Sequence, residues 1–114
     1  MPYLNIQTNA DIGPKQQAEL LDQASRQVAA MLGKPESYVM VALQAGVAMR
    51  FGGSDAPLAY LELKSLGLPK ARTSELSAVL CEWVEQVLDI PAARVYIEFS
   101  DPERSMWGWN GGTF

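Results

Sequence analysis

Apolar and polar residues alternate along two short stretches that lie half a chain apart. Residues 3–8 read YLNIQT and residues 60–65 read YLELKS, an offset of 57 positions in a chain of 114 residues. Such alternation is typical of a strand with one buried face. A second matching pair, residues 34–43 and 90–99, aligns a proline with a proline and then alternates apolar side chains again. The chain therefore contains two copies of one structural unit.

A helical pattern lies between the two strands of each unit. Pro14 suits the first turn of a helix, and Gly33 suits the position after its last turn. The second helix is predicted from about Thr73 until Pro91 ends it. Each unit is therefore β-α-β, and its two strands are expected to pair in parallel. The apolar residues at three- and four-residue steps are Ala18, Leu21, Ala24, Val28 and Met31 or Leu32, then Leu76, Val79, Leu80, Trp83, Val84 and Val87.

Two β-α-β units predict an α/β (α+β) fold with a four-stranded sheet and two helices on one face. The other face is too apolar for plain solvent surface and too charged for a dry core, so we expect other copies of the chain to bury it. The residues assigned to the helix-covered face are Leu4, Ile6, Val39, Val41, Leu43, Leu61, Leu63, Val95, Ile97 and Phe99. Those assigned to the other face are Tyr3, Asn5, Gln7, Met40, Ala42, Tyr60, Glu62, Lys64, Tyr96 and Glu98.

One domain is predicted over residues 1–114, with repeats at about 2–50 and 58–105 and an aromatic tail at 106–114. The glycine-rich residues 51–57 between the repeats lack the lysine and the spacing of a phosphate-binding loop. In the tail, an Asn-Gly turn signal follows two tryptophans that are two residues apart. That spacing places both tryptophans on one side of a short strand.

Composition narrows the candidate functions. A net charge of −4 and an isoelectric point near 4.7 argue against a nucleic-acid surface and against an anionic-lipid surface. We expect neither a signal peptide nor a membrane span, and hence a cytoplasmic protein. Cys81 is the only cysteine and histidine is absent, so neither a disulfide nor a metal site is expected.

Acid–base chemistry near pH 7 is left with few candidate groups: a perturbed carboxylate, a perturbed lysine, a tyrosine or the N-terminal amine. Pro2 becomes the N-terminal residue if Met1 is trimmed, and it then carries a free secondary amine at the tip of a strand. A reference α-amino group has a pKa of roughly 7.7–8.0. The amine of proline is more basic, so its pKa needs a larger depression.

Seven stretches of the chain together form a recognisable pattern: the Met-Pro start, TNADIGP, GKPESYVMV, MRFGGSDAP, LKSLG, RVYIEF and GWNGGTF. With them the whole chain resembles the tautomerase superfamily, and within it the macrophage migration inhibitory factor branch. The resemblance implies a homotrimer whose three sheets surround a central channel, with the sites lying between subunits. It also implies cofactor-independent keto-enol tautomerisation of α-keto acids such as phenylpyruvate, and of dopachrome-like compounds.

The same resemblance implies a role for particular residues. Pro2 is the catalytic base, which removes a proton beside a carbonyl and returns one to the other end of the enol. Lys34 engages the substrate carboxylate, and the backbone of Leu66, beside Ser65, contacts the substrate. A neighbouring subunit contributes Tyr96. The aromatic lining consists of Tyr38, Trp107, Trp109 and Phe114.

The chain departs from the family pattern at three places. Glu98 stands where the animal cytokine has asparagine; at ~6 Å and an effective dielectric of ~20 a carboxylate stabilises a protonated Pro2 by roughly 3 kcal/mol. Residues 58–61, Leu-Ala-Tyr-Leu, replace a Cys-Ala-Leu-Cys stretch, which excludes its thiol–disulfide chemistry. Trp107 replaces a smaller aliphatic residue and is expected to narrow the site or shift its substrate preference.

Two alternatives stay open beside the tautomerase. One is a binding or signalling module that mimics the cytokine, engages a receptor of that type and leaves the cell without a signal peptide. The other is a related reaction such as hydration of an unsaturated acid or dehalogenation. Members that catalyse those reactions place arginines near the proline, whereas the matching residue here is Lys34, so this reading ranks below tautomerisation.

Overall fold

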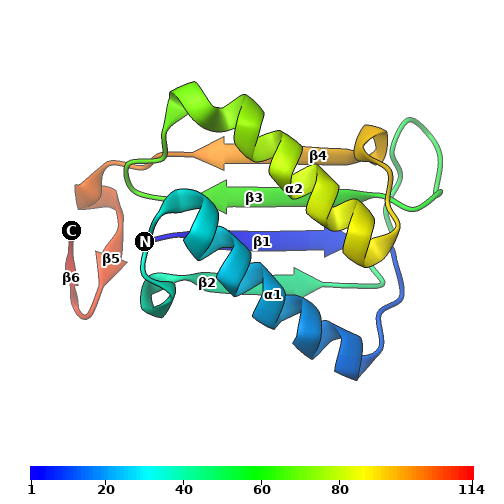
Figure 1. Cartoon of the computed structure of the whole chain (residues 1–114), viewed down its shortest axis with the longest axis horizontal. Coiled ribbons are helices and arrows are strands. Elements are labelled where there is room, and N and C mark those ends of the chain that lie inside the picture. The colour runs from blue at the N-terminus through cyan, green and yellow to red at the C-terminus, as the bar shows by residue number, and fades with distance from the viewer.

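Two helices cover one face of a four-stranded sheet in the computed structural model, which describes residues 1–114 (Figure 1). Neither helix combines the length and the apolar character needed to cross a membrane. The main elements are β1 (Tyr3–Thr8), α1 (Pro14–Leu32), β2 (Met40–Gln44), β3 (Ala59–Lys64), α2 (Thr73–Leu88), β4 (Val95–Ser100), β5 (Gly108–Trp109) and β6 (Gly112–Thr113). The short 3₁₀ helices are η1 (Glu36–Tyr38), η2 (Lys70–Arg72), η3 (Ala92–Arg94) and η4 (Arg104–Met106).

The strand order β2-β1-β3-β4 joins the two repeats along the middle of the sheet. Within each repeat the strands are parallel, β1 with β2 and β3 with β4, which confirms the β-α-β prediction. Strands β1 and β3 pair antiparallel, with Asn5 opposite Glu62. As a result, the start of β1 lies at the same end of the sheet as the ends of β3 and β4 (Figure 1).

The core lies between the sheet and the helices. Leu4, Ile6, Leu61 and Leu63 are fully buried there, as the alternation predicts. The buried residues of α1 are Leu20, Ala24 and Val28, and those of α2 are Leu76, Leu80, Trp83 and Val84. The assignment of Ala18 to the core was wrong, because four-residue steps back from Val28 reach Leu20, and Ala18 is exposed.

The helix ends follow their sequence signals at three of four places. Helix α1 begins at Pro14 and ends before Gly33, whose left-handed φ of 63° lets the chain turn. Helix α2 begins at Thr73 but ends at Leu88 rather than at Pro91. It stops early because Asp89 itself adopts the left-handed conformation, with a φ of 56°.

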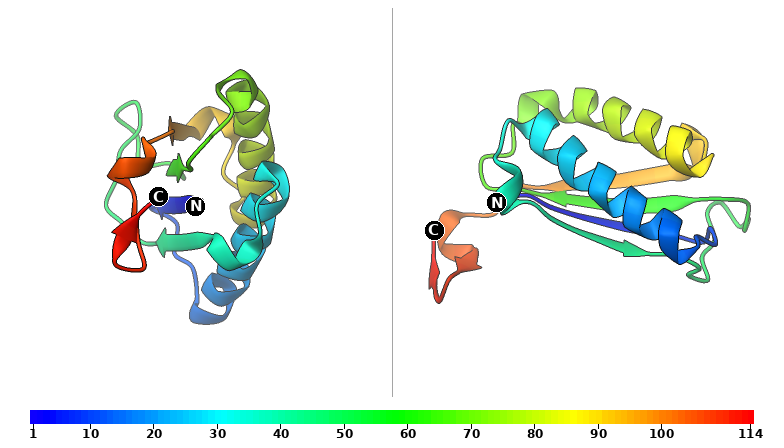
Figure 2. Two further views of the ribbon diagram at one scale, coloured as in Figure 1. Left: turned by 90° about the vertical axis from the view of Figure 1, so that its left-hand side faces the viewer. Right: turned by 60° about the horizontal axis from the view of Figure 1, so that its bottom comes forward.

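The face of the sheet away from the helices is open (Figure 2). Met40 and Tyr96, on the two edge strands, are each 66% exposed. Between them, the Tyr60 hydroxyl donates to Glu98 at 2.6 Å, and Lys64 pairs with Glu62 at 3.5 Å. Asn5, on central strand β1, is only 7% exposed, and its Oδ1 has no hydrogen-bond partner.

Arg94 organises the glycine-rich connection. Its guanidinium lies 5.2 Å from the centre of the Phe51 ring. It donates hydrogen bonds to four backbone carbonyls of this loop, of which those of Phe51 and Ser54 also accept each other's N–H groups. The acceptors are Phe51, Ser54, Ala56 and Pro57. This network gives the connection a structural role.

The aromatic tail forms the hairpin that its Asn-Gly signal predicts. Strands β5 and β6 pair antiparallel. The turn residues Asn110 and Gly111 both have positive φ, 52° and 80°, as a tight hairpin turn of this kind requires. Trp107 lies just before β5 rather than within it, so the prediction of one strand holding both tryptophans was wrong. The hairpin projects from the end of the sheet where β1 begins (Figure 2).

Candidate functional site

Five segments meet at the end of the sheet where β1 begins. Since each helix runs back along its sheet, the C-terminus of α1 returns to the start of β1 (Figure 1). The turns after β3 and β4 reach the same end because both strands run antiparallel to β1. The tail hairpin is the fifth segment. This convergence explains how residues distant in sequence form one site.

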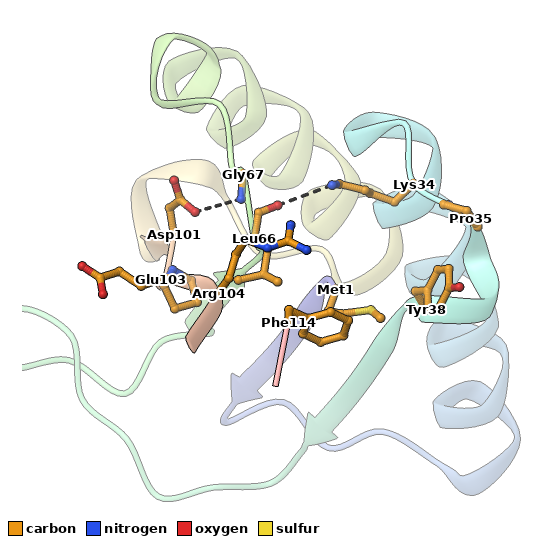
Figure 3. Close-up of a pocket in the computed structure, with 11 residues that line it drawn as sticks. Met1, Lys34, Pro35, Tyr38, Leu66, Gly67, Asp101, Glu103, Arg104 and Phe114 are labelled. Carbon is orange, nitrogen blue, oxygen red and sulfur yellow. Dashed lines mark hydrogen bonds between the residues drawn. The ribbon is translucent and has the colours of Figure 1, made fainter. Parts of the chain in front are cut away.

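Two cavities open at this end, and Met1 and Tyr38 line both of them. The first has a volume of about 620 Å³, and its walls include Lys34, Leu66 and Phe114 (Figure 3). The second has a volume of about 430 Å³ and is mostly apolar. Met1 therefore forms part of the wall between the two cavities.

Pro2 lies directly beneath Met1. Its side chain is fully buried, it lines the second cavity, and its carbonyl accepts the Met40 N–H at 3.0 Å. Burial lowers the pKa of the Met1 amine, and the Lys34 charge lowers it further. Both effects disfavour an ammonium ion at this end of the chain.

Lys34 follows the Gly33 cap, and its Nζ lies 3.4 Å from the carbonyl oxygen of Leu66. Leu66 belongs to a tight turn in which the Leu68 N–H donates to the Ser65 carbonyl at 3.2 Å. Gly67 allows the turn through a φ of 71°, and its N–H donates to Asp101 at 2.8 Å. Ser65 is buried and lines neither cavity. The turn thus holds the Leu66 backbone opposite Lys34 (Figure 3).

An aromatic wall bounds the site on the tail side. The rings of Tyr38 and Trp109 meet edge to face with centroids 6.3 Å apart. Trp109 stacks on Phe114 at 5.7 Å. Trp107 and Trp109 both line the second cavity. Such a wall offers flat apolar surface to an aromatic ligand.

Tyr96 and Glu98 do not join these cavities within one chain. Both lie on β4, the edge strand two strands away from β1. The Tyr96 ring packs against the Phe51 ring in a tilted arrangement, with centroids 4.6 Å apart, and Tyr96 lines a separate cavity of about 340 Å³. Glu98 accepts the Tyr60 hydroxyl, an interaction that raises the pKa of Tyr60 to about 12. Any contribution of Tyr96 or Glu98 to a site at Pro2 therefore needs a second copy of the chain.

Several lining residues were not expected from the sequence. Asp101, Glu103 and Arg104 follow β4 and line the first cavity. They carry no recognisable spacing motif, and only the pairing of β3 with β4 brings their segment beside the 65–68 turn. No group of three or more His, Cys, Asp or Glu side chains is placed to hold a metal ion. Burial raises the pKa of the Cys81 thiol.

A family model described as macrophage migration inhibitory factor matches residues 1–114. The macrophage migration inhibitory factor homolog of Brugia malayi is 45% identical over 116 aligned residues, covering 100% of this chain and 99% of that protein. A crystal structure of the Prochlorococcus marinus homologue superimposes with a TM-score of 0.91 at 46% identity and covers 98% of both chains. The Trichinella spiralis structure gives 0.90 at 34% identity and covers 98% of this chain and 99% of that one.

Fold and similarity agree over the whole chain, and together they define a tautomerase-superfamily protein. The chain belongs to the macrophage migration inhibitory factor family. The predicted fold, a four-stranded sheet with two helices on one face, is confirmed.

Proposed function

We propose that this protein is a cofactor-independent keto-enol tautomerase of aromatic α-keto acids such as phenylpyruvate. Pro2, after removal of Met1, is the catalytic base. The observation that carries the proposal is the position of Pro2, which is buried, lines the second cavity and directly follows Met1, a residue that lines both cavities. Loss of Met1 leaves the Pro2 amine facing the space that these cavities share.

The amine needs no cofactor for this chemistry. As a neutral base it takes the proton from the carbon next to the carbonyl, and as an ammonium it returns a proton to the other end of the enol. Burial and the Lys34 charge lower the pKa of the Met1 amine. We expect the same two causes to act in the same direction on the Pro2 amine, because both disfavour an ammonium ion and so favour the neutral form that acts as the base.

Lys34 binds the substrate carboxylate. Its Nζ is held only by a 3.4 Å contact with the Leu66 carbonyl, which leaves donor capacity for an anion. Leu66 forms the wall of the site on the opposite side, and the turn closed by the Leu68 N–H and the Ser65 carbonyl holds it there. The aromatic ring of the substrate lies against Tyr38 and Phe114 in the first cavity, next to the tryptophans of the tail.

The active protein is a homotrimer, in which a neighbouring subunit supplies Tyr96 and Glu98. The exposed Met40 and Tyr96 side chains on the face without helices support a covered sheet face. Glu98 arrives at the site with one carboxylate oxygen already bonded to Tyr60, which reduces its effect on Pro2.

The test is enol-to-keto conversion of phenylpyruvate, followed by absorbance, for the parent protein and for Pro2→Gly. Mass spectrometry first confirms that Met1 is absent from both. We expect the glycine variant to lose roughly a hundredfold to ten-thousandfold in kcat/KM, the range in which a positioned base contributes. Pro57→Gly, at an exposed proline of the connection between the repeats, controls for the loss of a proline ring.

Either of two results contradicts the proposal. A correctly processed parent protein without activity means that Pro2 is not a base for this reaction. A Pro2→Gly variant with full activity means that another group takes the proton. In both cases the reading as a binding or signalling protein, in which the cavities serve as a contact surface, takes first place.

A further inference from the structure

Arg104 is a second cation in the first cavity, at the side opposite the α1 C-terminus. It begins η4 and lines the cavity together with Lys34. Figure 3 shows its guanidinium pointing into the cavity, toward the side where Lys34 and Leu66 lie. A chain with a net charge of −4 thus directs two cationic groups into one hollow.

Neither cation has a carboxylate partner. The two ion pairs of the chain are Lys64–Glu62 and Arg72–Glu75, and both lie elsewhere. No hydrogen bond is formed by the Arg104 side chain, whereas Asp101 on the same wall already accepts the Gly67 N–H. The carboxylate of Glu103 points away from the cavity in Figure 3. No carboxylate therefore lies within ion-pair distance of either cation.

The cavity has a cationic end and an apolar end. Tyr38, Phe114 and Met1 supply the apolar surface, and the two cations point to the Leu66 side. Guanidinium presents a planar fork of donors that matches the two oxygens of a carboxylate, whereas an ammonium acts as a point charge. One carboxylate can accept from both groups at once.

We propose that Arg104 and Lys34 together bind the single carboxylate of the substrate, so that Arg104 is a specificity-determining residue for α-keto acids over their neutral analogues. This inference rests on the proposed function and deepens it, because it assigns the carboxylate to two residues from different segments. Lys34 comes from the end of α1, and Arg104 from the segment after β4. The site therefore selects an aromatic monocarboxylate.

The kinetic test compares phenylpyruvate with its methyl ester, which lacks the negative charge and is larger by one methyl group. In Arg104→Met we expect KM for the acid to rise about tenfold, the weight of one hydrogen bond to a charged group. KM for the ester and kcat for both substrates should change less than about twofold. Arg26→Met, at an exposed arginine of α1 that lines no cavity, is the matched control. An equal KM change for acid and ester, or no change, overturns the inference.

A binding test separates this inference from the proposed function. Titration calorimetry with 3-phenylpropanoate measures binding at the carboxylate site without turnover, because this ligand lacks the keto group of phenylpyruvate. We expect Arg104→Met to weaken its Kd about tenfold, and Arg104→Lys, which keeps the charge but loses the fork, to weaken it by a smaller factor. These losses in a protein without tautomerase activity would support the clamp and contradict the proposed function. An Arg104→Met protein with the parent Kd contradicts the clamp even if the parent is active.

Discussion

At the scale of single residues, the charge of Lys34 acts at two places. It lowers the pKa of the amine at the start of β1, after the larger effect of burial. The Lys34 Nζ also lies at the wall where a substrate carboxylate is proposed to bind. Substitution of Lys34 therefore has two separable consequences, one on basicity and one on substrate affinity.

Lys34→Met should shift the pH profile of kcat/KM to higher pH. In the proposed mechanism the neutral amine is the base, so activity should rise as pH passes the pKa of that amine. Loss of the neighbouring cation makes the ammonium form more stable and raises that pKa, so the variant loses more activity at pH 6 than at pH 9. The methyl ester of phenylpyruvate is the substrate of choice, because it removes the carboxylate contact from the measurement. Lys15→Met, an exposed lysine at the N-terminal end of α1, should leave the profile unchanged; an unchanged Lys34→Met profile contradicts the assigned cause.

The residues around Pro2 differ in how far the sequence could predict their placement. Pro2, Lys34 and Leu66 were expected near one another through the family resemblance, and the structure places them at one end of the sheet. Their roles stay predictions. Arg104 was not expected, because no local pattern marks a loop side chain that reaches a cavity only after β4 has paired with β3.

At the scale of elements, the end of α1 positions the site. Gly33 takes a left-handed φ of 63°, and Lys34 immediately follows it, with its N–H bonded to the Ala29 carbonyl at 3.0 Å. No heavy atom lies within 4 Å of a Cβ added at Gly33, so only backbone strain resists a substitution there. A substitution at Gly33 therefore measures the cost of the left-handed backbone conformation without a contribution from side-chain clashes.

Gly33→Ala should lower the free energy of unfolding by about 1 kcal/mol, because a β-carbon disfavours the left-handed conformation. Gly33→Asn should lose less, since asparagine tolerates that region better than alanine does. Urea unfolding followed by circular dichroism gives both values. If the two variants lose equal stability, strain at this φ is not what decides the end of the helix.

The strands and helix ends were predictable wherever a local sequence signal alone determines them. Alternation gave the four main strands, and Pro14 and Gly33 marked the two ends of α1. The end of α2 was displaced because Asp89, a residue without the freedom of glycine, nevertheless adopts a positive φ. Aspartate adopts a positive φ only occasionally, so its presence at position 89 does not mark the end of the helix in the sequence.

At the scale of the whole molecule, pairing between the repeats was the missing information. The internal repeat predicts a parallel pair within each unit but does not say which strands meet between units. Hydrogen bonding of β1 to β3 answers that question and leaves β2 and β4 at the edges. It also leaves one face of the sheet without helices (Figure 2).

If a second and a third copy cover this face, Ala42→Glu should break the trimer. Ala42 lies opposite Asn5 in the sheet register, so the new carboxylate would face the interface. Sedimentation should give about three times the 12.5 kDa chain mass for the parent and a lower mass for the variant. Ala18→Glu, on the exposed side of α1, is the matched control and should stay trimeric. A parent that sediments as a single chain contradicts the proposed assembly.

The two β-α-β repeats contact each other through the antiparallel pairing of β1 with β3 and are joined covalently by a single connection. This connection lies around Gly52 and Gly53, at the end of the sheet away from Pro2 (Figure 1). A break between those glycines leaves each β-α-β half whole, and Arg94 still reaches carbonyls on both sides of the cut, at Phe51 and Ser54. We therefore expect two separately produced fragments to associate, re-form the four-stranded sheet and restore a site to which both contribute residues.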